Sequence, residues 1–286
     1  MKEDGGGASL ASEWRRWVVE NLVRGAEEVD LVAILEGAGV DAAVARAAVR
    51  AEAEDPCFVG TRKALALHRK LEGLLDLYGD LHRQAEGHAR VDRHESLSRE
   101  AFFERYYFQN RPVVLRGTVV EPVGTWTPER LAGLGGQGTP SVRSVSLGDH
   151  AELLAALRPP ADFVVAEDSP VATLAAAGFQ SPDLPVRENV LLCQVHGRLR
   201  VQLVPAFELR RMADSAEEAE AVSRMEVTLG PGELLLLPVG WWFRYEALDA
   251  STSVSFRSFA ASAPNVTWEQ EPQPPEPTPP PRHRGG

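Results

Sequence analysis

The sequence predicts an α+β protein in which a helical region precedes a β-rich domain. Up to about residue 86, apolar residues recur at the three- and four-residue spacing of amphipathic helices. From Val190 onward, short apolar or alternating runs are separated by Gly and Pro turns, as in antiparallel strands. Residues 272–281 are dominated by proline and cannot build a core, so the chain is expected to end in a disordered tail.

Four helices are expected in the first part of the chain. Ser12 is expected to cap the first, and residues 27–36 form the second. Asp41 caps the third, which ends near Asp55-Pro56, because the residue before proline disfavours helix. The fourth spans about residues 61–84. Its apolar stripe comprises Leu67, Leu71, Leu74, Leu75, Tyr78 and Leu81.

The second part of the chain begins after a polar linker at residues 87–94. Ser98 is expected to cap a helix over 99–107, Thr127-Pro128 to start another, and residues 149–157 to form a third. The expected strands are Val113–Leu115, Phe163–Val165, Val190–Val195, Leu199–Val204, Met225–Leu229, Glu233–Leu237, Phe243–Glu246 and Thr252–Phe259.

The composition excludes several classes of protein. The formal net charge of −11 provides no basic surface for nucleic acid. No apolar run approaches the roughly 20 residues of a membrane span, and the Gly-rich N-terminus lacks a signal-peptide core. Cys57 and Cys193 lie far apart without zinc spacing, and two free thiols suit a reducing compartment. We therefore expect a cytoplasmic protein that binds neither nucleic acid nor membrane.

Several motifs along residues 98–260 point to one family. They are Phe102–Gly117, ending in RPVVLRG; Trp126–Leu131, WTPERL; Asn189–Val201, NVLLCQVHGRLRV; Gly240–Trp242, GWW; and Ser251–Phe256, STSVSF. In sequence and order they resemble the cupin-like JmjC proteins, hydroxylases that use Fe(II) and 2-oxoglutarate. The resemblance implies a cupin double-stranded β-helix, a jelly-roll barrel of two facing antiparallel sheets with flanking helices.

The resulting domain organisation has four parts. Residues 1–11 are expected to be disordered, and residues 12–90 to form a small all-α module. The cupin-like JmjC domain spans 96–262, and a disordered Pro-rich tail spans 263–286.

The residues that make this family catalytic are missing. The family binds iron through His-x-Asp on one strand and a distant histidine, which leaves positions open for cosubstrate and oxygen. The positions that match these ligands are Leu184, Val186 and Phe243. The lysine that holds 2-oxoglutarate in the family corresponds to Leu199. Four apolar replacements suggest a former pocket filled with hydrocarbon, since an empty polar cavity leaves unsatisfied groups.

Other residues near the lost site are weaker candidates for remaining chemistry. Asp183 and Glu188 flank it and are candidates for a displaced carboxylate pair, although no histidine accompanies them at ligand spacing. His196 is expected at a surface turn, His150 at a helix start, and His68 and His82 on a solvent-facing side of the long helix. The candidates for lining a pocket are Asn189, Gln194, Trp241, Trp242 and Phe243, with core packing the commoner role of such tryptophans.

These observations favour a catalytically inactive relative of the hydroxylases, acting as a binding or scaffold module without a cofactor. Its partner would be a peptide, a protein or an active paralogue. One alternative is an active Fe(II)/2-oxoglutarate dioxygenase with relocated ligands that hydroxylates a peptide or protein side chain. A second alternative is a metal-free cupin that binds a small molecule.

Overall fold

The chain divides into two compact units, Met1–Tyr78 and Gly79–Gly286. The computed structural model describes residues 10–117, 119–121, 126–166, 169–208, 222 and 224–268. The two segments expected to be disordered are residues 1–11 and 263–286, and most of each, residues 1–9 and 269–286, lies outside this range. Their disorder therefore remains a prediction.

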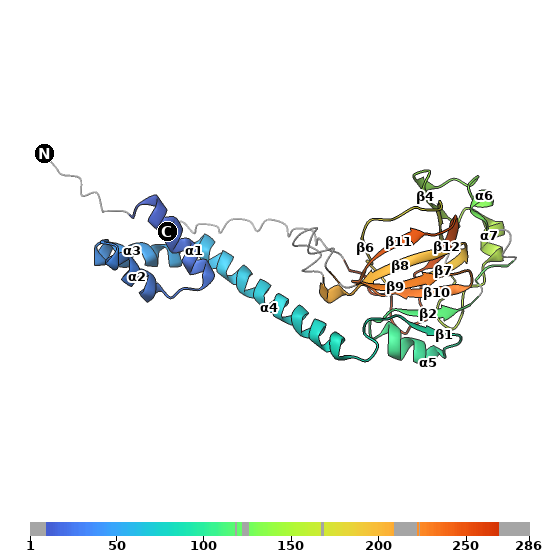
Figure 1. Ribbon diagram of the computed structural model, residues 1–286, viewed down its shortest axis with the longest axis horizontal. Helices are drawn as coiled ribbons and strands as arrows, with labels where there is room; N and C mark the ends of the chain where they lie inside the picture. Colours follow the sequence, from blue (N-terminus) through green and yellow to red (C-terminus); the bar gives the residue numbers. More distant parts are fainter. Residues whose placement is uncertain are drawn as a thin grey trace, which may run out of the picture. The chain divides into compact units, whose positions relative to one another are not determined.

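The first unit is helical, as Figure 1 shows in blue. Its elements are α1 (Ser12–Arg24), α2 (Glu28–Gly37), α3 (Ala42–Ala53) and the first part of α4 (Pro56–Gln84). Their shared core consists of Val18, Leu22, Leu31, Leu35, Ala45, Val49, Ala53 and Phe58. Asp41 caps α3 as expected, because its Oδ1 accepts hydrogen bonds from the backbone N–H groups of Ala43 and Val44 at 2.9 and 3.1 Å.

Two expected helix starts are wrong. Ser12 is the first residue of α1, and the N-cap is Ala11, which has no side-chain bond to offer. The fourth helix starts at Pro56 and not at Thr61. Asp55 Oδ1 accepts from the N–H groups of Cys57 and Phe58 at 2.9 and 3.1 Å, which caps the helix one turn earlier. Proline suits the first helical position because it has no N–H to satisfy there.

The apolar stripe of α4 does not enter the core of the first unit. Leu67, Leu71, Leu74 and Tyr78 are each about half exposed, at 59%, 50%, 46% and 55%. The division between the units falls within this helix, whereas the sequence places the domain boundary at 90–96. Within the second unit, His82 on the last turn of α4 packs against Phe207, with ring centroids 4.9 Å apart.

The second unit is built on two β-sheets (Figure 1). The larger has the order β1 (Asp92–His94), β2 (Val113–Arg116), β10 (Glu233–Leu237), β7 (Val190–His196), β12 (Ser251–Phe256), β5 (Val171–Ala175), β4 (Val142–Ser146) and β3 (Gln137–Gly138). The smaller has the order β6 (Leu184–Pro185), β11 (Trp242–Ala247), β8 (Leu199–Val204) and β9 (Met225–Leu229). All pairings are antiparallel except β1 with β2.

The two sheets pack face to face and confirm the expected α+β jelly-roll fold. Strand alternation shows how: Leu235 and Leu237 of β10 join a core with Val201 and Leu203 of β8, on the opposite sheet. Leu234 and Leu236 face the other way. They join a second core with residues of α5 (Arg99–Phe102) and the π-helical turn Phe103–Tyr107, and with Leu131 of α6 (Pro128–Leu131). The two tight cores hold the sheets at fixed positions.

Several short elements differ from the sequence expectation. The expected linker contains β1, an edge strand beside β2 in which Arg93 donates to the carboxylate of Glu233 and to the carbonyl of Thr228. The side chains of β1 are polar, so its sequence lacks the apolar pattern that predicts a strand. The segment Phe163–Val165 is not a strand: it is a turn with one bridge, between Val164 and Phe259. Strands β3, β4, β5 and β6 were not expected.

The start of the expected tail is ordered. Asn265 Nδ2 donates to the backbone carbonyls of Asn189 and Arg257, both at 2.9 Å. Thr267 forms a bridge with Glu188, and Trp268 N donates to the carbonyl of Arg187 at 2.6 Å. Residues 263–268 therefore belong to the second unit, because side-chain and backbone hydrogen bonds hold them to the start of β7.

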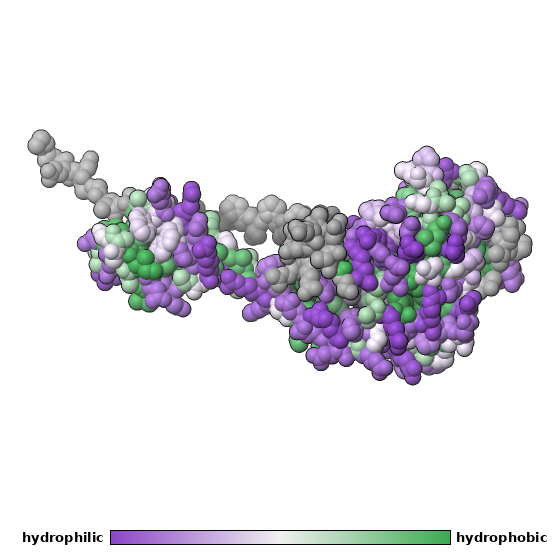
Figure 2. Space-filling model, viewed as in Figure 1, coloured by the Kyte–Doolittle hydropathy of each residue, from purple (hydrophilic) through white to green (hydrophobic). Residues whose placement is uncertain are grey.

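The outer face of the smaller sheet is polar. Arg200 pairs with Glu246 at 2.8 Å, and Arg244 donates to Gln202 at 2.6 Å. The side of the second unit seen in Figure 2 is largely hydrophilic. In the described part of the chain, no helix is both long and apolar enough to cross a membrane.

Candidate functional site

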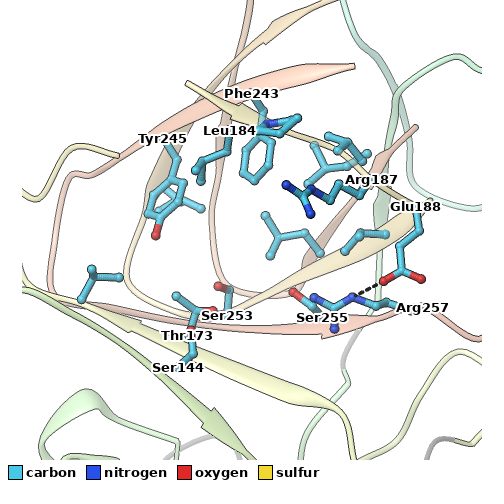
Figure 3. Close-up of a pocket in the computed structure, with 17 residues that line it drawn as sticks. Ser144, Thr173, Leu184, Arg187, Glu188, Phe243, Tyr245, Ser253, Ser255 and Arg257 are labelled. Atoms are coloured by element: carbon cyan, nitrogen blue, oxygen red, sulfur yellow. Dashed lines mark ion pairs between the residues drawn. The ribbon is translucent and has the colours of Figure 1, made fainter. Parts of the chain in front are cut away.

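A cavity of about 550 Å³ lies between the two sheets of the second unit. Its lining comes from both sheets and from the loop after β6: Val142, Ser144, Thr173, Leu184, Pro185, Val186, Arg187, Glu188, Val190, Leu192, Leu199, Leu237, Phe243, Tyr245, Ser253, Ser255 and Arg257. Figure 3 shows these side chains around an open interior. The cavity is the candidate functional site, since concave inter-sheet spaces are where such barrels hold ligands.

One wall carries all four positions at which the resemblance places functional residues. Leu184 of β6 and Phe243 of β11 are cross-strand partners. Val186 continues this pairing: its N–H donates to the carbonyl of Trp241, and its carbonyl accepts from Gly240 N–H, both at 2.8 Å. Leu199 lies on β8, on the far side of β11. The barrel thus brings these four positions together around one space.

This wall does not fit an iron centre or its cosubstrate. Leu184, Val186 and Phe243 offer no nitrogen or oxygen to Fe(II). Leu199 offers no cation to a carboxylate. Among the residues that the structure describes, no three His, Cys, Asp or Glu side chains lie close enough together to hold a metal ion.

The carboxylates that flank Leu184 and Val186 pair with arginines. Asp183 accepts two hydrogen bonds from Arg224, at 2.8 and 3.0 Å. Glu188 pairs with Arg257 at 2.9 Å, the ion pair drawn dashed in Figure 3. Both carboxylates therefore have cationic partners and no histidine beside them. The two pairs connect separate strands and suit a structural role.

The opposite wall is hydroxylated. Ser144 of β4 is the register partner of Thr173 on β5, and Thr173 is the partner of Ser253 on β12. The three therefore form a row across neighbouring strands on one face of the larger sheet. Ser255, two residues along β12, faces the same way. Figure 3 shows their hydroxyl groups below the apolar wall.

Arg187 and Tyr245 approach the cavity from opposite ends (Figure 3). Arg187 is exposed, and its guanidinium makes no hydrogen bond or ion pair with any residue in the described ranges. Tyr245 is partly buried, and burial raises the pKa of its phenol. At neutral pH the cavity therefore has a cation at one end and a neutral hydroxyl at the other.

Of the five residues expected to line a pocket, only Phe243 does so. Asn189 is instead a structural link: its Oδ1 accepts from Val239 N–H and its Nδ2 donates to Asn265 Oδ1, both at 2.9 Å. Gln194 is 1% exposed and donates to the carbonyls of His196 and Gly197 at the β7–β8 turn.

The two tryptophans also lie outside the cavity lining. Trp241 is 3% exposed, and its indole N–H donates to the carbonyl of Asn110 at 3.1 Å. Trp242 precedes Phe243 on β11, so its side chain points to the opposite face of the sheet. The commoner role for such tryptophans, packing, is therefore the one observed for Trp241.

The expectation of a filled pocket is wrong. Val186 and Leu199 are buried, but Leu184 and Phe243 are only half-buried and border the open space. Hydrocarbon side chains at these four positions leave the gap between the sheets open.

The histidines in the described ranges lie apart from the cavity lining. His82, expected to face solvent, is half-buried between Phe207 and Trp241, and burial is the main cause of its lowered pKa. His150 is the N-cap residue of α7 (Ala151–Ala156) but makes no side-chain cap bond. His196 ends β7 before the turn at Gly197. His94, not singled out from the sequence, bonds Tyr106 Oη at 2.7 Å.

Sequence reasoning missed Arg187, Tyr245 and the hydroxyl row. Serine and threonine in short polar strands carry no chemical signature. The register of β4, β5 and β12, which aligns them, was not visible because β4 and β5 were not expected. Arg187 follows the lost ligand positions directly, and that proximity was the available signal.

Comparisons with known proteins add little to this geometry. No family model matches the chain, and no curated protein matches it. Among solved structures, the chain is similar to "YcfD, a Ribosomal oxygenase from Escherichia coli", with 20% sequence identity and a TM-score of 0.40. The match covers 60% of this chain and 54% of that one, so the chain spans about half of that protein's length. A similarity of this size carries no argument about function.

Proposed function

We propose that this chain is a metal-independent binding protein on a JmjC-like cupin barrel, with the cavity between the sheets as its binding site. One observation carries the proposal. Leu184, Val186, Phe243 and Leu199, the four positions that resemble ligand and cosubstrate positions, together border an open cavity of about 550 Å³. The space is open, and all four side chains at these positions are hydrocarbon.

An open apolar cavity favours binding over a purely structural barrel. When a ligand displaces water from hydrocarbon walls, the free energy of the system falls and binding is favoured. The volume is within the range of small-molecule sites, roughly 300–1,000 Å³. A small molecule or a side chain of a partner peptide fits this description. A scaffold role beside an active paralogue also remains compatible with it.

The alternative of an active oxygenase has less support. Relocated ligands would have to come from Asp183 or Glu188, and both carboxylates are held in ion pairs with arginine. Recruiting either for iron would break its ion pair with Arg224 or Arg257, which is costly for partly buried groups.

A fluorescent dye tests the proposal. N-phenyl-1-naphthylamine is neutral and emits strongly only in apolar surroundings, so the full-length protein should enhance its emission saturably without added metal. Thr173→Phe places a bulky ring on the cavity wall and should abolish the enhancement. Thr228→Phe makes the same change on the exposed face of β9 and should leave it intact.

Circular dichroism would establish that both variants are folded. Absence of dye binding to the wild-type protein would contradict the proposal. Equal dye binding by wild type and Thr173→Phe would place the dye elsewhere and would also contradict it.

A further inference from the structure

We propose that the inter-sheet cavity binds an amphipathic carboxylic acid, with the carboxylate at Arg187 and the hydrocarbon body against Phe243 and Leu184. This inference rests on the proposed function and names the ligand class for that same site. It depends on three features of the cavity: a cation at one end that has no partner among the described residues, an apolar wall and a hydroxylated wall.

The cation is the first feature. Two arginines line the cavity, Arg187 and Arg257. Arg257 is neutralised by Glu188 at 2.9 Å. The Arg187 side chain has no partner in the part of the chain that the structure describes, and its guanidinium extends toward Phe243 (Figure 3). These three ionisable side chains leave one net positive charge at this end of the cavity.

A carboxylate is the anion that this end fits best. A guanidinium presents two parallel N–H groups that match the two oxygens of a carboxylate. A phosphate with two charges usually requires several cations or the N-terminus of a helix. The lining includes no lysine and no residue of a helix, so one singly charged planar anion is the better match.

The apolar wall defines the body of the ligand. Beyond Arg187 the cavity is bordered by Leu184, Phe243 and Leu199 of the smaller sheet, and Leu192 and Leu237 of the larger sheet extend this apolar surface. Hydrocarbon placed there is removed from water and stabilises the complex by about 0.8 kcal/mol per buried CH₂. A second charged group in the same position would lose its hydration without a partner. The wall therefore selects a monocarboxylate and disfavours a short dicarboxylate such as 2-oxoglutarate.

The hydroxylated wall gives the ligand a second side. Ser144, Thr173 and Ser253 align across three strands, and Tyr245 closes the end opposite Arg187. The raised pKa of Tyr245 keeps its phenol protonated and able to donate. A hydroxyl or carbonyl on the ligand body would satisfy these groups, so an amphipathic acid fits better than a plain alkane.

Isothermal titration calorimetry with three probes of equal length tests this inference. The probes are octanoate, octanamide and octylamine, titrated into the full-length protein. Octanoate should bind about tenfold more tightly than octanamide, as expected for one charge-assisted pair. Octylamine should bind more weakly than either, because its ammonium would face Arg187.

Arg187→Gln should weaken octanoate binding about tenfold and leave octanamide unchanged. Arg244→Gln is the matched control: Arg244 follows Phe243 on β11, lies outside the cavity lining and bonds Gln202 on the outer face. It should preserve the preference for octanoate.

The outcomes separate the two proposals. If N-phenyl-1-naphthylamine binds but octanoate does not bind, or binds no better than octanamide, the acid preference is refuted while the binding cavity stands. Retention of the preference by Arg187→Gln would also refute it. If the dye does not bind either, the proposed function itself fails.

Discussion

Leu184 and Phe243 are cross-strand partners on β6 and β11, and both side chains border the cavity. The resemblance to JmjC-type hydroxylases places a metal-binding histidine at each of these positions. Because the two face each other across one strand pair, side chains introduced at both positions would share one local wall while the backbone pairing stays intact. This relationship makes it possible to test by substitution whether the wall can hold a metal.

The wild-type protein should bind well under one equivalent of Fe(II) after anaerobic loading, measured by elemental analysis. The triple variant Leu184→His, Val186→Asp, Phe243→His restores three donors on adjacent strands and should raise iron binding toward one equivalent. Stoichiometric iron in the wild-type protein would contradict the proposed function.

The control for this reconstruction moves the same residue types one position along the chain. Pro185→His, Arg187→Asp and Arg244→His introduce identical donors. The imidazole introduced at position 244 would point to the outer face of the sheet, since neighbouring side chains on a strand face opposite ways and Arg244 bonds Gln202 on that face. The three donors would therefore not converge, and this variant should bind no more iron than wild type. Equal iron binding by the two triple variants would show that Leu184, Val186 and Phe243 do not occupy the positions of a ligand set.

Calorimetry should detect no 2-oxoglutarate binding to the wild-type protein at millimolar concentration. Leu199 provides no cation, and the neighbouring arginines are engaged outside the cavity lining. Arg198 pairs with Asp249 at 2.7 Å, and Arg200 pairs with Glu246 at 2.8 Å. Micromolar affinity would show that another cation has taken over the role of the family lysine.

Some elements of the fold could be predicted from the sequence and others could not, depending on whether a local pattern defines them. Strands β9 and β10 match their expected bounds, because each is an apolar or alternating run between Gly and Pro turns. Ser98, Thr127 and Asp41 cap helices as expected, because a cap depends on a local bond. Strands β4 and β5 were missed, because their pairing depends on partners distant in sequence.

The candidate site was harder to predict than the fold. Residue types at Leu184, Val186 and Phe243 suggested a filled pocket, but whether hydrocarbon closes a gap depends on the spacing of two sheets. Asn189 resembled a pocket residue, yet its amide bonds Val239 and Asn265. A sequence indicates which side chains are present near a site, but not which of them already have partners.

Phe243→Ala should reduce the free energy of unfolding by about 1–2 kcal/mol, less than the 3–5 kcal/mol typical of a fully buried aromatic residue. Phe243 is half-buried at the edge of an existing cavity, so truncation removes fewer contacts. Its cross-strand partner Leu203 does not line the cavity and is 0% exposed, and Leu203→Ala should cost about 2–5 kcal/mol. Urea denaturation measures both, and a larger loss for Phe243→Ala would indicate a closed pocket.

The free energy of unfolding of the second unit should fall as the pH drops through about 6.5, in part because of His82. Burial lowers the pKa of His82 in the folded state, so the unfolded chain takes up a proton first. The stability that depends on neutral His82 is present above the unfolded pKa and is lost between that value and the lower folded pKa. His82→Gln should therefore reduce the loss of unfolding free energy between about pH 7.5 and about pH 5.5.

His68→Gln controls for the general effect of acid, because His68 is exposed on the same helix and pairs with Glu72 at 3.3 Å. Urea titrations at the two pH values compare the variants with wild type. Identical pH dependence in His82→Gln and wild type would show that His82 is not a buried neutral group.

Asn189 and Asn265 should prove energetically coupled. Asn189 Nδ2 donates to Asn265 Oδ1, and Asn265 Nδ2 donates to the Asn189 carbonyl, both at 2.9 Å. Either single change to alanine leaves buried amide partners unpaired and should cost about 1–3 kcal/mol. The double variant removes both partners and should cost less than the sum of the two, measured by urea denaturation of all four proteins. Additive losses would mean that the two side chains act independently and that residues 263–268 are not held to β7 through this pair.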